Sequence, residues 1–344
     1  MQMRPGVTVC CSLALATLLT TTWLARLNAI SSDRKLIRFS YVGSPVDPRH
    51  ATALRFKKEL ERLSHGAIHV ELFGGGQLGG DRDAIEGVRL GTFEMTVSGA
   101  GIFANFEPVM GVTAVPFLFD GFDDAWAYLD STAVDPLEQA LLKQRLHVLG
   151  YWENGFRCIT NSVRPVREPA DLAGLSIRTP ENPLITATLI AMGANASPLP
   201  WPELYMALQQ QAYDGQENPI PVIYLNNLFE VQEYLSITNH TYEPMPLVIN
   251  EAFWQRLNSA EQSWLVSAAQ DSQQFNRELV RKQSVELQQK LAAAGMEIIT
   301  PDRQPFREAT AQVRGELREA IGAKLLDDAE TFLREFHQNK NEEP

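Results

Sequence analysis

The segment from Ser259 to Ala294 contains neither proline nor glycine. Ser259 followed by Gln262 fits the capping box that starts a helix. At 1.5 Å per residue, one helix over this segment would be about 54 Å long. That length exceeds one small domain, so the helix is expected to run along two packed units. The alternative is two shorter helices, with a break near Gln273 or Ser284.

Strand and helix patterns alternate in the rest of the chain, and a loop-rich middle separates two such series. The first series predicts strands at 36–42, 68–73 and 93–98 and helices at 48–64 and 81–90. The second predicts strands at 146–151, 175–179, 234–238 and 247–250 and helices at 183–192 and 201–211. A strand at 296–300, a helix at 304–337 and a disordered polar tail at 338–344 are expected at the end. This alternation predicts two α/β units.

The first thirty residues have the order of a secretory signal peptide. Arg4 precedes an uncharged, largely apolar run from residue 5 to 25, and Ala29 supplies a small residue before a polar segment. This order predicts cleavage near Ala29 and export of the chain. An uncleaved membrane anchor is the alternative. Removal of residues 1–30 would leave Cys158 as the one cysteine, so no intrachain disulfide is expected.

Charge and motifs exclude several classes of function. The net charge of -12 argues against nucleic-acid binding, which needs a basic face. His65 and His69 have the spacing of a metal pair, but Gly66 favours a turn between them. The glycine-rich stretch 74–80 lacks the lysine of a phosphate loop, and no nucleophile motif is present. We therefore expect no metal, no cofactor and no enzyme activity.

Two arginines lie in strand-like surroundings where their charge needs an explanation. Arg157 follows Gly155-Phe156, and Arg178 follows Ile177. A guanidinium group there is either solvated on an edge strand or directed into a cleft, where its planar fork suits a carboxylate. The spacing of these arginines along the chain, taken by itself, favours a guanidinium group that is solvated on an edge strand.

Several segments resemble those of a known family. Residues 194–209 read ANASPLPWPELYMALQ, and residues 213–219 read YDGQENP. Further pieces occur in the same order along the chain, at 76–79, 90–95, 116–119, 155–157, 171–178 and 238–242. Together they cover roughly residues 34–335 and closely resemble the DctP-type solute-binding proteins of TRAP transporters, the tripartite ATP-independent periplasmic transporters.

This resemblance implies an α/β, two-lobed periplasmic-binding-protein-like fold. A ligand cleft would lie between the lobes, which crossing strands and a long lobe-spanning helix would connect. Lobe I is then expected to comprise 34–154 plus 244–283. Lobe II is expected to comprise 155–243 plus 284–337.

The resemblance also suggests ligand-binding residues. The family's main ligand arginine corresponds to Arg178, although Ser176 replaces the usual lysine of that motif. A second arginine corresponds to Arg157, and the asparagine of the Gln-Glu-Asn-Pro motif corresponds to Asn218. Trp201 fits the core as well as the cleft. Less specific candidates are Glu153, Gln77, Trp201 and Tyr242.

The function implied is capture of a small organic acid in the periplasm and its delivery to the membrane subunits of a TRAP permease. A sugar acid such as a uronate or aldonate is favoured, with a C4-dicarboxylate or a 2-oxo acid as alternatives. The protein is expected to be a monomer, or else a dimer. Two other classes remain open: a ligand-binding sensor, and a secreted α/β enzyme that acts on an organic acid.

Overall fold

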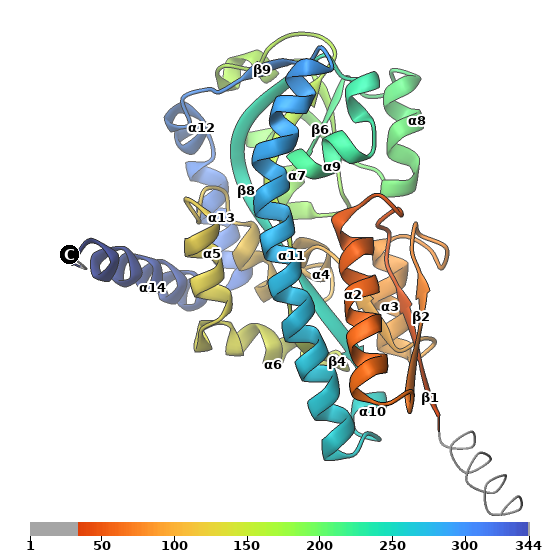
Figure 1. Cartoon of the computed structure of the whole chain (residues 1–344). Helices are drawn as coiled ribbons and strands as arrows, with labels where there is room; N and C mark the ends of the chain where they lie inside the picture. The colour runs from red at the N-terminus through yellow and green to blue at the C-terminus, as the bar shows by residue number, and fades with distance from the viewer. Residues whose placement is uncertain (1–33, 343–344) are drawn as a thin grey trace, which may run out of the picture.

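The computed structural model describes residues 34–342 (Figure 1). The expected signal peptide at residues 1–30 lies outside this range. Within it, no helix is both long enough and apolar enough to cross a membrane.

A single mixed sheet organises the described residues. Its strands are β1 (Lys35–Ser40), β2 (Ile68–Phe73), β3 (Met95–Val97), β4 (Leu146–Asn161), β5 (Ser176–Thr179), β6 (Asn195–Pro198), β7 (Gly215–Pro219), β8 (Tyr234–Asn250) and β9 (Glu297–Ile299). They are arranged in the order β2-β1-β3-β8-β4-β7-β5-β6, and β9 pairs with β8.

This order contains the same parallel unit twice. Strands β2-β1-β3 form one unit and β6-β5-β7 the other, and β8 and β4 run antiparallel between them. Helices α2 (Pro48–Leu63) and α3 (Asp81–Leu90) connect the strands of the first unit. Helices α7 (Pro183–Ala191) and α8 (Leu204–Gln209) do so in the second. The alternation expected from the sequence is therefore present in both units.

The two connecting strands are longer than the sequence patterns indicated. The expected strands at 234–238 and 247–250 are one strand, β8. Pro244 and Pro246 fit inside it because β3 pairs only with its end at 247–249 and β9 with its start at 234–236. Between those stretches, no strand of the described part of the chain pairs with that edge of β8, so none there requires a proline N–H.

Helix α11 (Ser259–Ala293) is one continuous helix, so the alternative of two shorter helices is wrong. Figure 1 shows it running past both parallel units. Its capping box differs from the expected pair by one residue. The Asn258 side chain accepts from the Glu261 N–H at 3.0 Å, and the Glu261 carboxylate accepts from the Asn258 N–H at 2.8 Å.

The C-terminal region forms three helices instead of the expected one: α12 (Gln304–Ala309), α13 (Ala311–Ile321) and α14 (Ala323–Glu342). Gly322 has φ 104°, which a continuous helix does not allow. The expected disordered tail is wrong for residues 338–342, which continue α14. Side chains of α13 and α14, assigned from the sequence to lobe II, pack in a cluster with residues assigned to lobe I.

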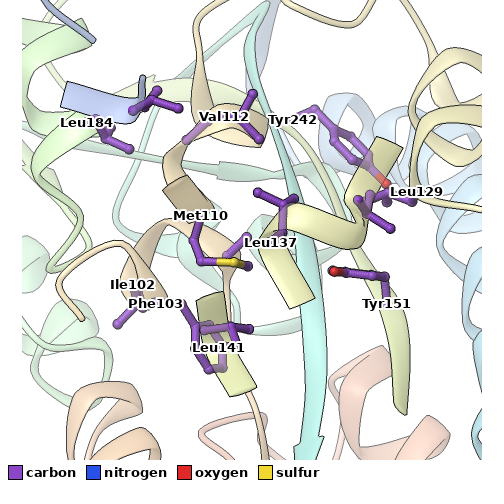
Figure 2. Close-up of a cluster of buried hydrophobic side chains, with 14 of the residues drawn as sticks. Ile102, Phe103, Met110, Val112, Leu129, Leu137, Leu141, Tyr151, Leu184 and Tyr242 are labelled. Carbon is purple, nitrogen blue, oxygen red and sulfur yellow. The ribbon is translucent and has the colours of Figure 1, made fainter. Parts of the chain in front are cut away.

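The remaining elements are short. They are α4 (Ala100–Phe103), α5 (Phe122–Leu129), α6 (Asp135–Lys143), α9 (Ile220–Leu225) and α10 (Glu251–Trp254), with 3₁₀ turns at 108–114, 132–134, 169–172, 201–203 and 228–230. Several of them contribute to the apolar cluster in Figure 2, which contains both Leu184 of α7 and Val112 of the 3₁₀ turn at 108–114. Leu184 also contacts the backbone at Gly111 so closely that a side chain there would collide with it.

Candidate functional site

A polar pocket lies where the two parallel units meet. Val42 follows β1, Gly99 follows β3 and Pro180 follows β5, so the carboxyl ends of parallel strands from both units face it. Ligands of open α/β sheets bind at such strand ends. The empty space is about 360 Å³, including the part open to solvent. The lining residues are Val42, Arg49, Asp81, Gly99, Ile102, Asn154, Arg157, Arg178, Pro180, Trp201, Asn218 and Glu243.

Arg178 is a buried cation that has no carboxylate partner within residues 34–342. It lies in β5 and is 2% exposed. Its Nε and Nη2 both donate to the Leu199 carbonyl, at 2.8 and 2.6 Å. Among the described residues, no hydrogen bond or ion pair involves its Nη1. Burial lowers the pKa of Arg178 to about 10, a partial offset coming from the charge of Glu217. An anion in the pocket would satisfy this group.

Arg157, in β4, has the opposite surroundings. Its Nε pairs with the Glu217 carboxylate, its Nη2 bonds to the same carboxylate at 2.7 Å, and its Nη1 pairs with Glu243. Burial by itself would lower the pKa of Arg157, but the charges of Glu217 and Glu243 outweigh it and raise the pKa. The guanidinium group therefore already carries its counter-charges.

Asn218 lies in β7 beside Arg157, with 4% of its surface exposed. Its Nδ2 donates to the Gln216 side chain, and its Oδ1 accepts from Arg157 Nη2 at 3.2 Å. These bonds fix the orientation of the amide. Asn218 reaches the pocket as part of the network around Arg157.

Glu153 and Tyr242 do not line the pocket. The Glu153 carboxylate accepts from Trp126 Nε1 and from the Tyr242 hydroxyl, each at 2.7 Å. Tyr242 belongs to the cluster of Figure 2. Burial raises the pKa of Glu153 to about 7, against the opposing effect of the two hydrogen bonds. The pair forms a separate polar group in the interior.

Of the other two candidates from the sequence, Trp201 lines the pocket and Gln77 does not. Gln77 is exposed and outside the pocket, in the glycine-rich loop. Trp201 lines the pocket and also packs against the apolar cluster of the second unit. The loop comes close to the second unit, because a side chain at Gly76 would touch Pro202.

Four polar pocket residues were not identified from the sequence: Arg49, Asp81, Asn154 and Glu243. Arg49 and Asp81 lie in the first turns of α2 and α3. Their position after the strands of an α/β unit is a usable signal, because such sites collect at strand ends. Glu243 lies in the middle of β8. The sequence patterns predicted two separate strands there, at 234–238 and 247–250, so they assigned no strand position to Glu243.

Hydrogen bonds hold the two units together around the pocket. Asn105 Nδ2 donates to the Glu181 carbonyl at 2.8 Å, and the Ser44 hydroxyl donates to Asn226 Oδ1 at 3.1 Å. Gly101 lets Asn182 approach so closely that any side chain at this glycine would overlap it. The units are therefore in direct contact around the pocket, which remains partly open to solvent.

A comparison with protein families matches residues 39–319 to the family described as bacterial extracellular solute-binding protein, family 7 (DctP). The chain is 40% identical over 307 residues to the 2,3-diketo-L-gulonate-binding periplasmic protein YiaO of Escherichia coli. That match covers 88% of this chain and 94% of YiaO.

Solved structures agree with this match. The sugar acid binding protein DctPAm of Advenella mimigardefordensis, in complex with galactonate, has a TM-score of 0.86 and 31% identity, over 88% of this chain and 99% of that one. A TRAP periplasmic solute-binding protein of Polaromonas sp. JS666, bound to D-erythronate, has a TM-score of 0.84 and 32% identity, over 86% and 98%. The expected two-lobed α/β fold is confirmed by these similarities.

Proposed function

Because the chain belongs to the bacterial extracellular solute-binding proteins of family 7, we propose that it binds a small organic acid for a TRAP transporter. The favoured ligand is a sugar acid. Similar proteins carry names or ligands of this class, namely 2,3-diketo-L-gulonate, galactonate and D-erythronate. The protein would act in the periplasm and release its ligand to the membrane subunits of the permease.

One observation carries this proposal for the chain itself. Arg178 is a buried cation with no carboxylate partner among the described residues, and it lines the pocket between the two units. A buried charge without a partner is unfavourable, so the arrangement is understandable when a ligand supplies the opposite charge. The carboxylate of an organic acid can accept two hydrogen bonds from the free end of this guanidinium group.

We propose the lobe boundaries that the family resemblance implies. Lobe I would comprise 34–154 plus 244–283, and lobe II 155–243 plus 284–337, with α13 and α14 packing back onto lobe I. The chain would cross between the lobes in β4, in β8 and in α11. Closure about these crossings would enclose the ligand.

A binding role without turnover also fits the chemistry of the pocket. Its titratable groups are arginines and carboxylates. The buried cysteine, Cys158, has a pKa raised to about 12, because burial disfavours the thiolate. A thiol in that state is a poor nucleophile.

A thermal-shift screen of the purified chain tests this function. Galactonate, D-erythronate, 2,3-diketo-L-gulonate, D-glucuronate and succinate would each be added at increasing concentration. Binding to the folded state raises apparent stability by about 2.7 kcal/mol at a hundredfold excess over Kd. We expect at least one acid to raise the Tm of the parent and to raise that of Arg178→Ala clearly less at the same concentration. A screen in which no acid raises the Tm would argue against a binding protein. Consumption of an acid during incubation with the purified chain would also argue against it.

A further inference from the structure

We propose that Arg49 and Asp81 form a second recognition point, which binds a hydroxyl group of the ligand and excludes a second carboxylate. This inference rests on the proposed function and narrows it to hydroxylated monocarboxylates. Both residues belong to the first parallel unit, whereas Arg178 belongs to the second. A ligand that contacts both points therefore connects the two units.

Arg49 is held in place at the pocket but is incompletely paired. It follows Pro48 in the first turn of α2 and is 8% exposed. Its Nε is buried and has no hydrogen-bond partner in the described part of the chain. The nearest carboxylate oxygens, of Asp47 and Asp81, each lie 3.8 Å from its guanidinium nitrogens, beyond hydrogen-bond distance. A buried N–H of this kind calls for an acceptor.

The backbone around Arg49 gives it little freedom. A Cβ atom at Gly43 would lie 2.9 Å from the Cβ of Arg49, so only glycine leaves room for this side chain as it is placed. Asp47 caps the same helix by accepting from the Arg49 N–H at 2.8 Å. Arg49 is therefore directed to the pocket by the start of α2.

Asp81 supplies the acceptor beside this donor. It is the first residue of α3, where the helix N-terminus favours a negative charge. One of its oxygens accepts from the Ser98 hydroxyl at 2.6 Å, and the other has no partner among the described residues. A ligand hydroxyl can accept from Arg49 and donate to Asp81 at once, whereas a carboxylate can only accept.

The charges around the pocket decide how many carboxylates a ligand can carry. Arg49, Arg157 and Arg178 supply three positive charges to the lining, and Asp81 and Glu243 supply two negative ones. Behind this lining, further carboxylates face Arg157 and Arg49, namely Glu217 and Asp47. Four carboxylates thus face three arginines, so the surroundings offer no positive charge for a second ligand carboxylate beyond that of Arg178.

A second ligand carboxylate would therefore be buried without a counter-charge and beside Asp81. Burial of two carboxylates at one site is strongly unfavourable unless one of them takes up a proton. The geometry consequently favours aldonates and keto-aldonates over the corresponding dicarboxylates.

Titration calorimetry with matched acids tests this at pH 7.5. Galactonate and galactarate differ only in the far end, which is a hydroxymethyl group in one and a carboxylate in the other. D-erythronate and meso-tartrate form a shorter pair of the same kind. We expect the parent to bind at least one monocarboxylate, and to bind it at least 100-fold more tightly than its dicarboxylate counterpart. Asp81→Asn should narrow that ratio at least tenfold, since it removes the opposing charge.

Arg49→Gln should weaken binding of the monocarboxylate at least tenfold. Its control is Arg82→Gln, which changes the same charge at an exposed position and should leave the affinity within about twofold. Gly43→Ala, which leaves Arg49 in the chain but displaces it, should reproduce the loss in a folded protein. Circular dichroism verifies folding of each variant.

Several results would overturn this assignment: equal affinity for both members of a pair, parent-like binding by Arg49→Gln, or failure of both galactonate and D-erythronate to bind. The proposed function would survive all three, provided that some other carboxylate bound in a manner dependent on Arg178. If no acid bound at all, both would fail.

Discussion

Individual arginines of the pocket differ in what surrounds their guanidinium groups. Arg157 is paired with Glu217 and Glu243, and these ion pairs fix the position of Arg157 in the lining of the pocket. Arg178 has the Leu199 carbonyl and no carboxylate. Removing one member of a buried ion pair leaves the other charge buried without a partner, which destabilises the fold. Removing a buried charge that has no partner instead eliminates the cost of burying that charge. We therefore expect the two arginines to contribute to different properties, Arg157 mainly to folding and Arg178 to the proposed ligand binding.

This difference predicts opposite stability effects of the same substitution. Arg157→Met should lower the free energy of unfolding by about 3–5 kcal/mol, because two buried carboxylates lose their partner. Arg178→Met should leave the ligand-free protein as stable as the parent or more stable. Urea denaturation of the three proteins without ligand measures both effects. Equal losses for the two variants would show that Arg178 is structurally paired and not reserved for a ligand.

Glu153 predicts a pH dependence of stability. Burial raises its pKa in the folded state to about 7, above the ordinary value for glutamate. Between those two values the folded state binds more protons than the unfolded state, so the free energy of unfolding falls as the pH rises. Above about pH 7, Glu153 is ionised in the folded state, and the full cost of burying its charge lowers the free energy of unfolding.

Glu153→Gln removes this penalty and keeps an oxygen for Trp126 and Tyr242, which both donate to the same carboxylate oxygen. From pH 5 to pH 8, we expect the parent to lose about 1–3 kcal/mol more stability than the variant does. Denaturation at the two pH values tests this. Parallel curves for both proteins would mean that Glu153 is ionised normally in the fold.

At the scale of elements, the contact between β4 and α11 accounts for the shape of the crossing strand. Pairing of β4 with β8 shifts register at 148–150, 153–155 and 157–159. Near two of these irregularities, side chains of α11 accept backbone N–H groups: Gln273 from Tyr151 at 2.7 Å, and Asn276 from Glu153. Asn276 also donates to Thr52 of α2 at 3.0 Å. Amides of α11 thus replace strand partners.

Asn276→Ala should therefore destabilise the fold by about 1–3 kcal/mol, because a buried N–H of β4 loses its acceptor and the Thr52 hydroxyl loses a donor. Gln274→Ala is the matched control, since Gln274 is an exposed amide of the same helix whose bond to Glu278 is on the surface. It should change stability by less than about 0.5 kcal/mol. Thermal and urea denaturation compare Asn276→Ala with Gln274→Ala. Equal effects of the two substitutions would show that the hydrogen bonds of Asn276 do not stabilise the fold.

The sequence was most informative where one physical rule dominated. The absence of proline and glycine predicted α11, and the family motifs located four pocket residues, Arg157, Arg178, Trp201 and Asn218. Periodicity failed where tertiary contacts decide the outcome, as in β8, whose prolines are tolerated because one of its edges is free of strands there. Arg49 and Asp81 were missed because their role depends on two helix starts that meet only in the folded chain.

At the scale of the whole molecule, the two parallel units have the same strand order although the sequence shows no repeat. Each unit brings its strand ends to the shared pocket, and contacts such as Asn105 to Glu181 hold the units together around it. The net charge of -12 repels anions at a distance. A carboxylate ligand must therefore be held by local positive charge, and Arg178 is the group free to provide it.

Calorimetric titration of galactonate, or of whichever acid raises the Tm most, into the parent and Arg178→Ala tests this central claim most directly. Loss of the guanidinium group leaves the ligand carboxylate buried without its partner, so the variant should bind about 2–5 kcal/mol more weakly. Arg178→Lys keeps the charge but not the fork, and it should also bind clearly more weakly than the parent. Binding of the acid to folded Arg178→Ala with the affinity of the parent would contradict the account.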